Sequence, residues 1–244
     1  MRRITKQAGD KYLLQWASKE KPTTGKEAGN AWKRFSRHKK HTRNICVREQ
    51  YQLCCYSEAD FNTRKLGFHL EHIQPKGQFP GQTFEHANLA GSAISEESKH
   101  TLDNMDIFGG FARDRGTHDD WYHPDAFIHP LRPDCEHFYH YETSGRIVPR
   151  ANQPRRDRAR ARLTLYRLNL NAPLLVSARK TILEALENQL AGITDLTMLE
   201  QLACHHLLPR DGVLPEFHSA RKQRFGKLGL KVLTEQAPAD LTPP

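Results

Sequence analysis

The sequence lacks any apolar run long enough to cross a bilayer. Its basic opening, residues 1–6, is not followed by a hydrophobic stretch that could serve as the core of a secretory signal. The five cysteines are an odd number, and they lack the regular spacing of a disulfide framework. We therefore expect a cytoplasmic protein with reduced thiols and no membrane association.

Glycine-rich phosphate-binding loops are also missing. Neither Gly-x-x-x-x-Gly-Lys nor Gly-x-Gly-x-x-Gly occurs in the 244 residues. Any dependence on ATP would therefore have to come from a partner protein. We also find no internal repeat.

Positive charge is in excess, because 37 Lys and Arg residues face 28 Asp and Glu residues, for a net charge of +9. A basic surface of this kind favours a polyanionic partner such as nucleic acid. The charge is concentrated in two stretches, 33–43 and 150–162, which could instead be solvated helix faces. The candidate phosphate contacts are Lys39, Lys40, Arg43, Arg155, Arg156 and Arg158.

The hydrophobic pattern predicts an α+β fold in which helices dominate. Residues 28–52 and the last third of the chain read as helical, whereas 67–73 suits a strand that Pro75 and Gly77 end. A hairpin is expected between 126 and 149. We divide the chain into a basic helical segment (1–52), a central segment (53–150) and a helical C-terminal segment (151–244), which together form one unit.

Two helix starts can be read in the C-terminal segment. Asn171 has the side chain of an N-cap, and Thr197 with Glu200 has the spacing of a capping box. We therefore expect helices to begin next to these residues.

The chemistry-bearing pattern is His-x-Glu-His at the end of the expected strand, with Asn88 sixteen positions after His72. Cutting a phosphodiester requires a base that activates water and a cation that neutralises the developing charge. Glu71 could ligate Mg²⁺ or Mn²⁺, and a neutral His72, with an ordinary pKa of about 6.5, could be the general base. Asn88 could ligate the metal or hold His72 in place.

Adjacent residues on a regular strand point to opposite faces, so Glu71 and His72 would share a cleft only if the strand twisted or broke after them. The turn at Pro75, Lys76 and Gly77 is placed to allow this. Lys99 and His100 follow on the next expected helix and could complete the site. Taken alone, the motif could also be structural.

Residues 54–58, 69–76 and 88–89 together resemble the HNH ββα-metal module, and more narrowly the PtuB-like HNH proteins of Septu and retron defence systems. The resemblance extends to residues 1–4 with 14–16, 127–135, 145–147, and 168–171 with Arg179. It implies a ββα-metal core, within residues 53–150, embedded in a mostly helical domain. By this resemblance His72 matches the general base, Glu71 the preceding metal ligand and Asn88 the middle residue of the motif.

The resemblance also implies an activity and partners. It implies a metal-dependent endonuclease that cuts DNA, or a structured RNA such as tRNA, in defence against phage. The expected partners are a PtuA-like ATPase and, in retron systems, a reverse transcriptase with its RNA–DNA product.

The sequence departs from that family at its zinc-binding cysteines. Relatives carry two Cys-x-x-Cys pairs, but here the first is Cys54-Cys55-Tyr56-Ser57, and residues 91–97 contain no cysteine. We therefore predict no structural zinc at these positions. The third HNH residue could be Glu97 or His100, and we favour His100. The loss of the cysteines also allows a decayed scaffold that only binds nucleic acid or bridges partners.

Overall fold

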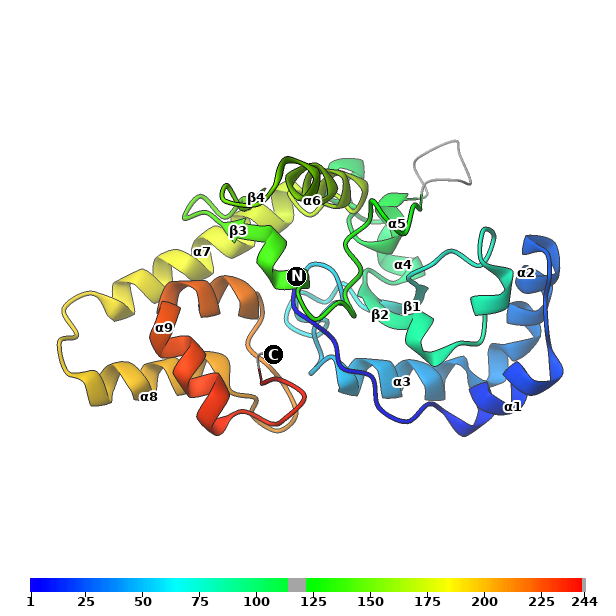
Figure 1. Cartoon of the computed structure of the whole chain (residues 1–244), viewed down its shortest axis with the longest axis horizontal. Helices are drawn as coiled ribbons and strands as arrows, with labels where there is room; N and C mark the ends of the chain where they lie inside the picture. Colours follow the sequence, from blue (N-terminus) through cyan, green and yellow to red (C-terminus); the bar gives the residue numbers. More distant parts are fainter. Residues whose placement is uncertain (114–121, 243–244) are drawn as a thin grey trace.

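Helices make up most of the regular secondary structure, and two small antiparallel sheets lie between them (Figure 1). The computed structural model describes residues 1–113 and 122–242. The architecture is α+β, as the hydrophobic pattern predicts. No helix within the described ranges combines the length and the apolar character that a membrane crossing requires.

The N-terminal helices are α1 (Lys11–Lys19), α2 (Gly25–Arg34) and α3 (Lys39–Glu49). Thr24 and Glu27 form a capping box at the start of α2, so two N–H groups that the helix leaves free are satisfied there. An apolar cluster that includes Leu13, Trp32 and Phe35 packs these helices against Leu89 of the central sheet.

The central sheet pairs β1 (Phe68–His72) with β2 (Leu89–Ala93) in antiparallel register, with Glu71 opposite Ala90 and His72 opposite Leu89. This confirms the strand predicted within residues 67–73. The short helix α4 (Glu96–Lys99) follows β2 and is capped by Ser95. The residues of β2, Leu-Ala-Gly-Ser-Ala, have little intrinsic strand preference, and their burial in the sheet stabilises them instead.

The second sheet pairs β3 (Tyr139–Tyr141) with β4 (Ile147–Pro149), which confirms the hairpin predicted before residue 149. The short helix α5 (Gly110–Arg113) lies between the two sheets in sequence. Single-turn 3-10 helices occur at Phe35–His38, Pro80–Gln82, His86–Asn88, Asn104–Asp106 and Cys135–Phe138.

Four helices form the C-terminal segment: α6 (Arg155–Arg167), α7 (Pro173–Leu190), α8 (Leu196–Leu207) and α9 (His218–Gln236). Both predicted N-caps are wrong. The N-cap of α7 is Ala172, because the side chain of Asn171 hydrogen-bonds the backbone N–H and C=O of Ile147, each at 2.8 Å. The cap of α8 is Asp195, which accepts from the N–H of Thr197 at 2.7 Å.

The main hydrophobic core contains residues from all three predicted segments, for example Ile4, Phe108 and Leu168. Arg179 of α7 is fully buried at the edge of this core and donates to the carbonyls of Gly145 and Leu170, each at 2.7 Å. Gly145 has φ of +83°, and a Cβ there would overlap the backbone of α7, so only glycine fits.

Candidate functional site

His69 and Glu71 lie on one face of β1 and form a buried pair. The Nε2 atom of His69 is 3.2 Å from Oε2 of Glu71, and the hydroxyl of Tyr56 donates to Oε1 at 3.3 Å. The Nδ1–H of His69 donates to the carbonyl of Ile94 at 2.8 Å. Burial lowers the pKa of His69, but the hydrogen bond and charge of Glu71 outweigh it and raise the pKa overall. A proton therefore sits between the two side chains at neutral pH more readily than it would for a free histidine.

Helix α5 packs directly over this pair. A Cβ on Gly110 would overlap the carboxylate of Glu71 and lie 2.8 Å from Nε2 of His69, so the close approach requires glycine. The ring of Phe111 lies 4.1 Å from that of His69, and the ammonium of Lys99 lies 4.4 Å from the centre of the Phe111 ring. The His69–Glu71 pair is thus enclosed between β1 and α5.

His72 lies on the opposite face of β1, against the N-terminal helices. Its Nε2 atom is 3.0 Å from the carbonyl oxygen of Thr83, which can only accept, so Nε2 carries the proton and Nδ1 is the basic nitrogen. The ring of Trp32 meets the His72 ring edge-on, with centroids 4.4 Å apart.

Two cations lie beside this aromatic contact. The ammonium of Lys39 is 5.0 Å from the Trp32 ring. Burial lowers the pKa of Lys39, and the nearby charge of Lys76 lowers it further. The surroundings of His72 are therefore both aromatic and positively charged.

Asn88 closes the loop that joins β1 to β2. Its Oδ1 atom accepts the N–H of Gln74 at 2.7 Å, and its amide donates to the carbonyls of Gln74 and Gln82, each at 3.0 Å. The side chain is buried, with the residue 3% exposed. The three hydrogen bonds hold the loop that carries Thr83, and so they set the position of the carbonyl that orients His72.

The predicted site residues are therefore only partly brought together. Glu71 meets His69, the first residue of the motif, for which no role was predicted, and His72 lies across the sheet from Glu71. His100 is exposed just after α4, and Glu97 is exposed in its first turn. The period of two along a strand was the available signal for His69, because residues 69 and 71 share a face.

Cys54 belongs to the segment that resembles the first zinc-binding pair of the family, and Ser92 lies beside it. The sulfur of Cys54 accepts the N–H of Ala93 at 3.2 Å and lies 4.0 Å from the hydroxyl of Ser92. Burial raises the pKa of Cys54, but hydrogen bonds from Cys55, Ala93 and Ser57 lower it overall to about 5. Hydrogen-bond donors thus surround this sulfur.

A separate cluster of possible metal ligands joins the N-terminal arm to the sheet. Single ligand atoms of Cys46, Glu49 and His86 lie within 4.8 Å of one another. The ammonium of Lys6 is 2.7 Å from the Glu49 carboxylate and 3.6 Å from the sulfur of Cys46. Burial raises the pKa of Cys46 to about 11. A cation is therefore already present as the Lys6 ammonium, and a metal would have to displace it.

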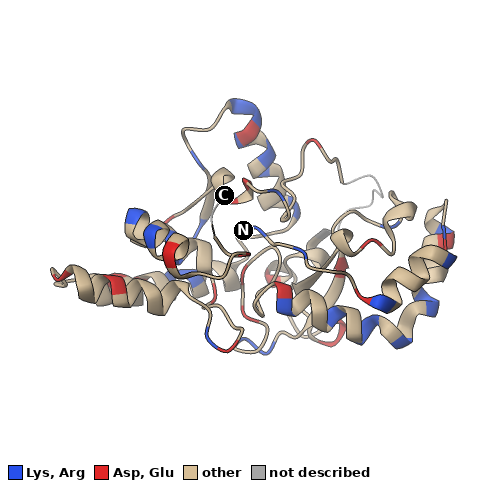
Figure 2. Ribbon diagram, turned by 60° about the horizontal axis from the view of Figure 1, so that its bottom comes forward, with Lys and Arg blue, Asp and Glu red and all other residues tan. Residues whose placement is uncertain are grey.

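The predicted phosphate contacts lie in two places. Lys39, Lys40 and Arg43 are in α3, among the basic segments that Figure 2 shows along the N-terminal helices at its right end. The guanidinium of Arg43 lies 4.7 Å from the Phe68 ring. Arg155, Arg156 and Arg158 are in the first turn of α6.

No protein-family model matches the chain. It is similar to a protein of Vibrio cholerae serotype O1 biovar El Tor named "Retron Vc95 putative HNH endonuclease". The two are 29% identical over 160 residues, which cover 62% of this chain and 70% of the relative. This similarity supports the HNH and retron parts of the resemblance, and the narrower likeness to PtuB of Septu systems stays a prediction.

Proposed function

We propose that the chain is a metal-dependent HNH endonuclease that hydrolyses phosphodiester bonds of nucleic acid. The observation that carries the proposal is the orientation of His72, whose Nε2–H is fixed on Thr83 by a loop that Asn88 closes. The same hairpin carries Glu71, and α4 follows it in the order of a ββα-metal module. The name of the Vibrio relative agrees with this assignment.

We propose that the buried pair binds a divalent cation in place of the proton that it shares. Glu71 offers a carboxylate oxygen and His69 a ring nitrogen, 3.2 Å apart. The carboxylate suits Mg²⁺ or Mn²⁺, and the imidazole beside it favours the transition metal. When bound, the cation would neutralise charge that develops on the phosphate. We propose His100, with Glu97 as the alternative, as the further ligand from the end of α4.

The remaining chemistry is assigned to side chains of the chain itself. His72 takes a proton from water at Nδ1, and the Thr83 carbonyl stabilises the imidazolium that forms. Asn88 is a positioning residue in this proposal, because its amide is engaged by Gln74 and Gln82. Lys39 and Lys76 would hold the phosphate over the end of β1, where Glu71 and His72 emerge on its two sides.

The test is a cleavage assay on DNA and on structured RNA with Mg²⁺ or Mn²⁺, using the protein alone and with its ATPase. We expect His72→Ala and His72→Gln to lower the rate by about 100-fold or more, as loss of a general base does. His140→Ala is the matched control, because His140 is exposed on β3. Cleavage by His72→Ala at the wild-type rate would refute the proposal.

The second candidate is a decayed scaffold that binds nucleic acid or bridges partners without cutting. It is favoured by the placement of Glu71 and His72, which are 4% and 6% exposed and lie on opposite faces of β1. It predicts that His72→Ala keeps both nucleic-acid binding and protection against phage. Loss of protection with intact binding would count against it.

We further propose that the chain is the effector of a phage-defence system, working in the cytoplasm with a PtuA-like ATPase. In a retron system its partners would include the reverse transcriptase and its RNA–DNA product, and the name of the Vibrio relative supports this setting. Co-purification of the chain with the products of its neighbouring genes tests the assignment. An isolated chain, without either partner, would contradict it.

A further inference from the structure

A basic groove of about 840 Å³ runs between α6 and β4. Ile147 and Leu165, both buried, form part of its apolar floor. Met105 and Ala112 line it from the segment that precedes and forms α5. Figure 1 shows this segment beside α6, where the N–H of Gly109 donates to the carbonyl of Leu168 at 2.8 Å.

Three cations line the groove. Arg146, Arg162 and Arg167 contribute to its walls, and the groove has no Asp or Glu among the lining residues that the structure describes. The Nε atom of Arg167 is buried and has no hydrogen-bond partner among the described residues. Such a set of guanidinium groups is complementary to a chain of phosphates.

Tyr166 gives the groove an exposed aromatic ring. It is 80% exposed, and it lies four residues after Arg162, so the two side chains share one face of α6. A single exposed apolar residue is common on protein surfaces. A tyrosine at the rim of a groove lined by arginines is instead the combination that binds unpaired bases, since stacking requires a free base face.

We infer that this groove binds a single strand of nucleic acid, with one base stacked on Tyr166 and its phosphates on Arg146, Arg162 and Arg167. In a duplex the base faces are covered by neighbouring base pairs, so a duplex could contact the arginines but could not stack on Tyr166. The inference rests on the proposed function in taking the strand as substrate, but binding can be measured without cleavage.

The groove lies next to the candidate catalytic hairpin. Ala112 lines the groove, and Gly110, two residues earlier in α5, contacts Glu71. The Cα atoms of residues two positions apart are separated by at most about 7.6 Å. A strand that leaves the groove past α5 therefore arrives at the His69–Glu71 pair.

The experiment measures binding of the full-length protein to labelled single-stranded DNA, single-stranded RNA and duplex, by fluorescence anisotropy in EDTA to prevent cleavage. We expect Tyr166→Ala to raise the Kd for single strands about 5- to 150-fold, the effect of losing one stacked base. Tyr166→Trp should bind single strands as the wild type does, and Tyr166→Ala should leave duplex binding unchanged. Arg162→Gln should reduce the salt dependence of log Kd by about 0.7.

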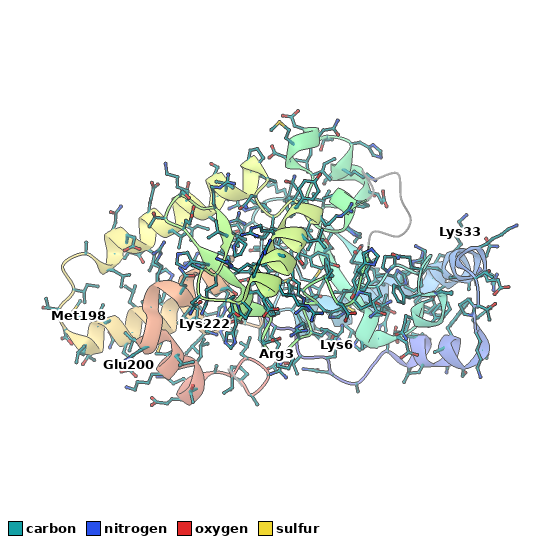
Figure 3. The ribbon with its side chains drawn as sticks, turned by 45° about the horizontal axis from the view of Figure 1, so that its top comes forward. Arg3, Lys6, Lys33, Met198, Glu200 and Lys222 are labelled. Atoms are coloured by element: carbon teal, nitrogen blue, oxygen red, sulfur yellow. The ribbon has the colours of Figure 1, made fainter. Side chains whose placement is uncertain are left out.

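Met198→Ala is the control. Met198 is 54% exposed in α8, which contributes no lining residue to the groove, and Figure 3 shows it at the opposite end of the molecule from Lys33. Single-strand binding by Tyr166→Ala that equals the wild type would overturn the inference, as would an equal loss of duplex binding. The two proposals fail separately. If Tyr166→Ala loses binding in EDTA but the wild type cuts nothing with metal, only the nuclease proposal fails.

Discussion

Asn88 allows the sharpest test of how the hairpin is built, because its two possible roles respond oppositely to one substitution. As a metal ligand, an amide oxygen can be replaced by a carboxylate without loss, since hard cations prefer charged oxygen. If Asn88 instead holds the loop, its amide cannot be replaced by a carboxylate, because the amide nitrogen donates to the carbonyls of Gln74 and Gln82, each at 3.0 Å. A carboxylate there would face two acceptors and donate to neither.

The size of the effect follows from the hydrogen bonds. Each neutral bond contributes about 1 kcal/mol net, so removal of all three in Asn88→Ala should lower the free energy of unfolding by about 2 to 3 kcal/mol. The range begins at 2 kcal/mol because Gln82 is exposed, so water can partly replace the hydrogen bond between its carbonyl and Asn88. Asn88→Asp keeps the acceptor for Gln74 N–H but adds repulsion, so we expect a loss of similar size.

Urea unfolding and a cleavage assay with Mn²⁺ titration measure the two properties on the same samples. We expect both variants to unfold at lower urea concentration and to cut slowly at saturating metal, because His72 loses its fixed partner. Asn88→Asp with wild-type stability and wild-type cleavage would refute the clamp, and tighter Mn²⁺ binding by that variant would support a ligand role.

Three further predictions concern stability and the candidate site. Gly110→Ala should destabilise the fold by about 1 to 3 kcal/mol and reduce cleavage, because its Cβ overlaps Glu71, while Gly81→Ala, with open space around it, should change neither; equal melting temperatures of the two would contradict this. Burial raises the pKa of Glu58, but the Met1 ammonium and the N–H of Ser219 lower it to about 2. The ionised Glu58 therefore stabilises the fold above its unfolded pKa of about 4.3, and this stabilisation is lost as the pH falls toward 2. We expect the free energy of unfolding of Glu58→Gln to change less with pH in this range than that of the wild type. Urea unfolding at several pH values measures the difference. Arg179→Met should cost about 3 to 5 kcal/mol in chemical denaturation, because the carbonyls of Gly145 and Leu170 lose their buried donor; a loss below 1 kcal/mol would show that neither bond matters.

The elements that sequence predicted best are those with a strong periodic pattern and clear ends. The strand within 67–73 is ended by Pro75, and the C-terminal helices follow from their leucine spacing. The cap predicted at Thr197 is wrong because Asp195, two residues earlier, supplies the capping carboxylate. The cap predicted at Asn171 is wrong because a side chain that can cap a helix can also bind a distant backbone. Asn171 bonds Ile147, 24 positions away, and only the folded chain shows that competition.

The candidate site was also predicted only in part, because its contacts join segments that are distant in the sequence. The motif identified Glu71, His72 and Asn88. The strand stays regular through the first two, so they point to opposite faces, and the break expected after them does not bring them into one cleft. The sequence could not show that Gly110 and Phe111 cover His69, because that contact joins segments some forty residues apart without any local signal. Nor could it place Thr83 against His72.

The close approach of Gly110 to Glu71 also has a mechanical consequence. Helix α5 is one turn long and places Ala112 in the wall of the groove and Gly110 against the carboxylate, so a displacement of this helix would change both places at once.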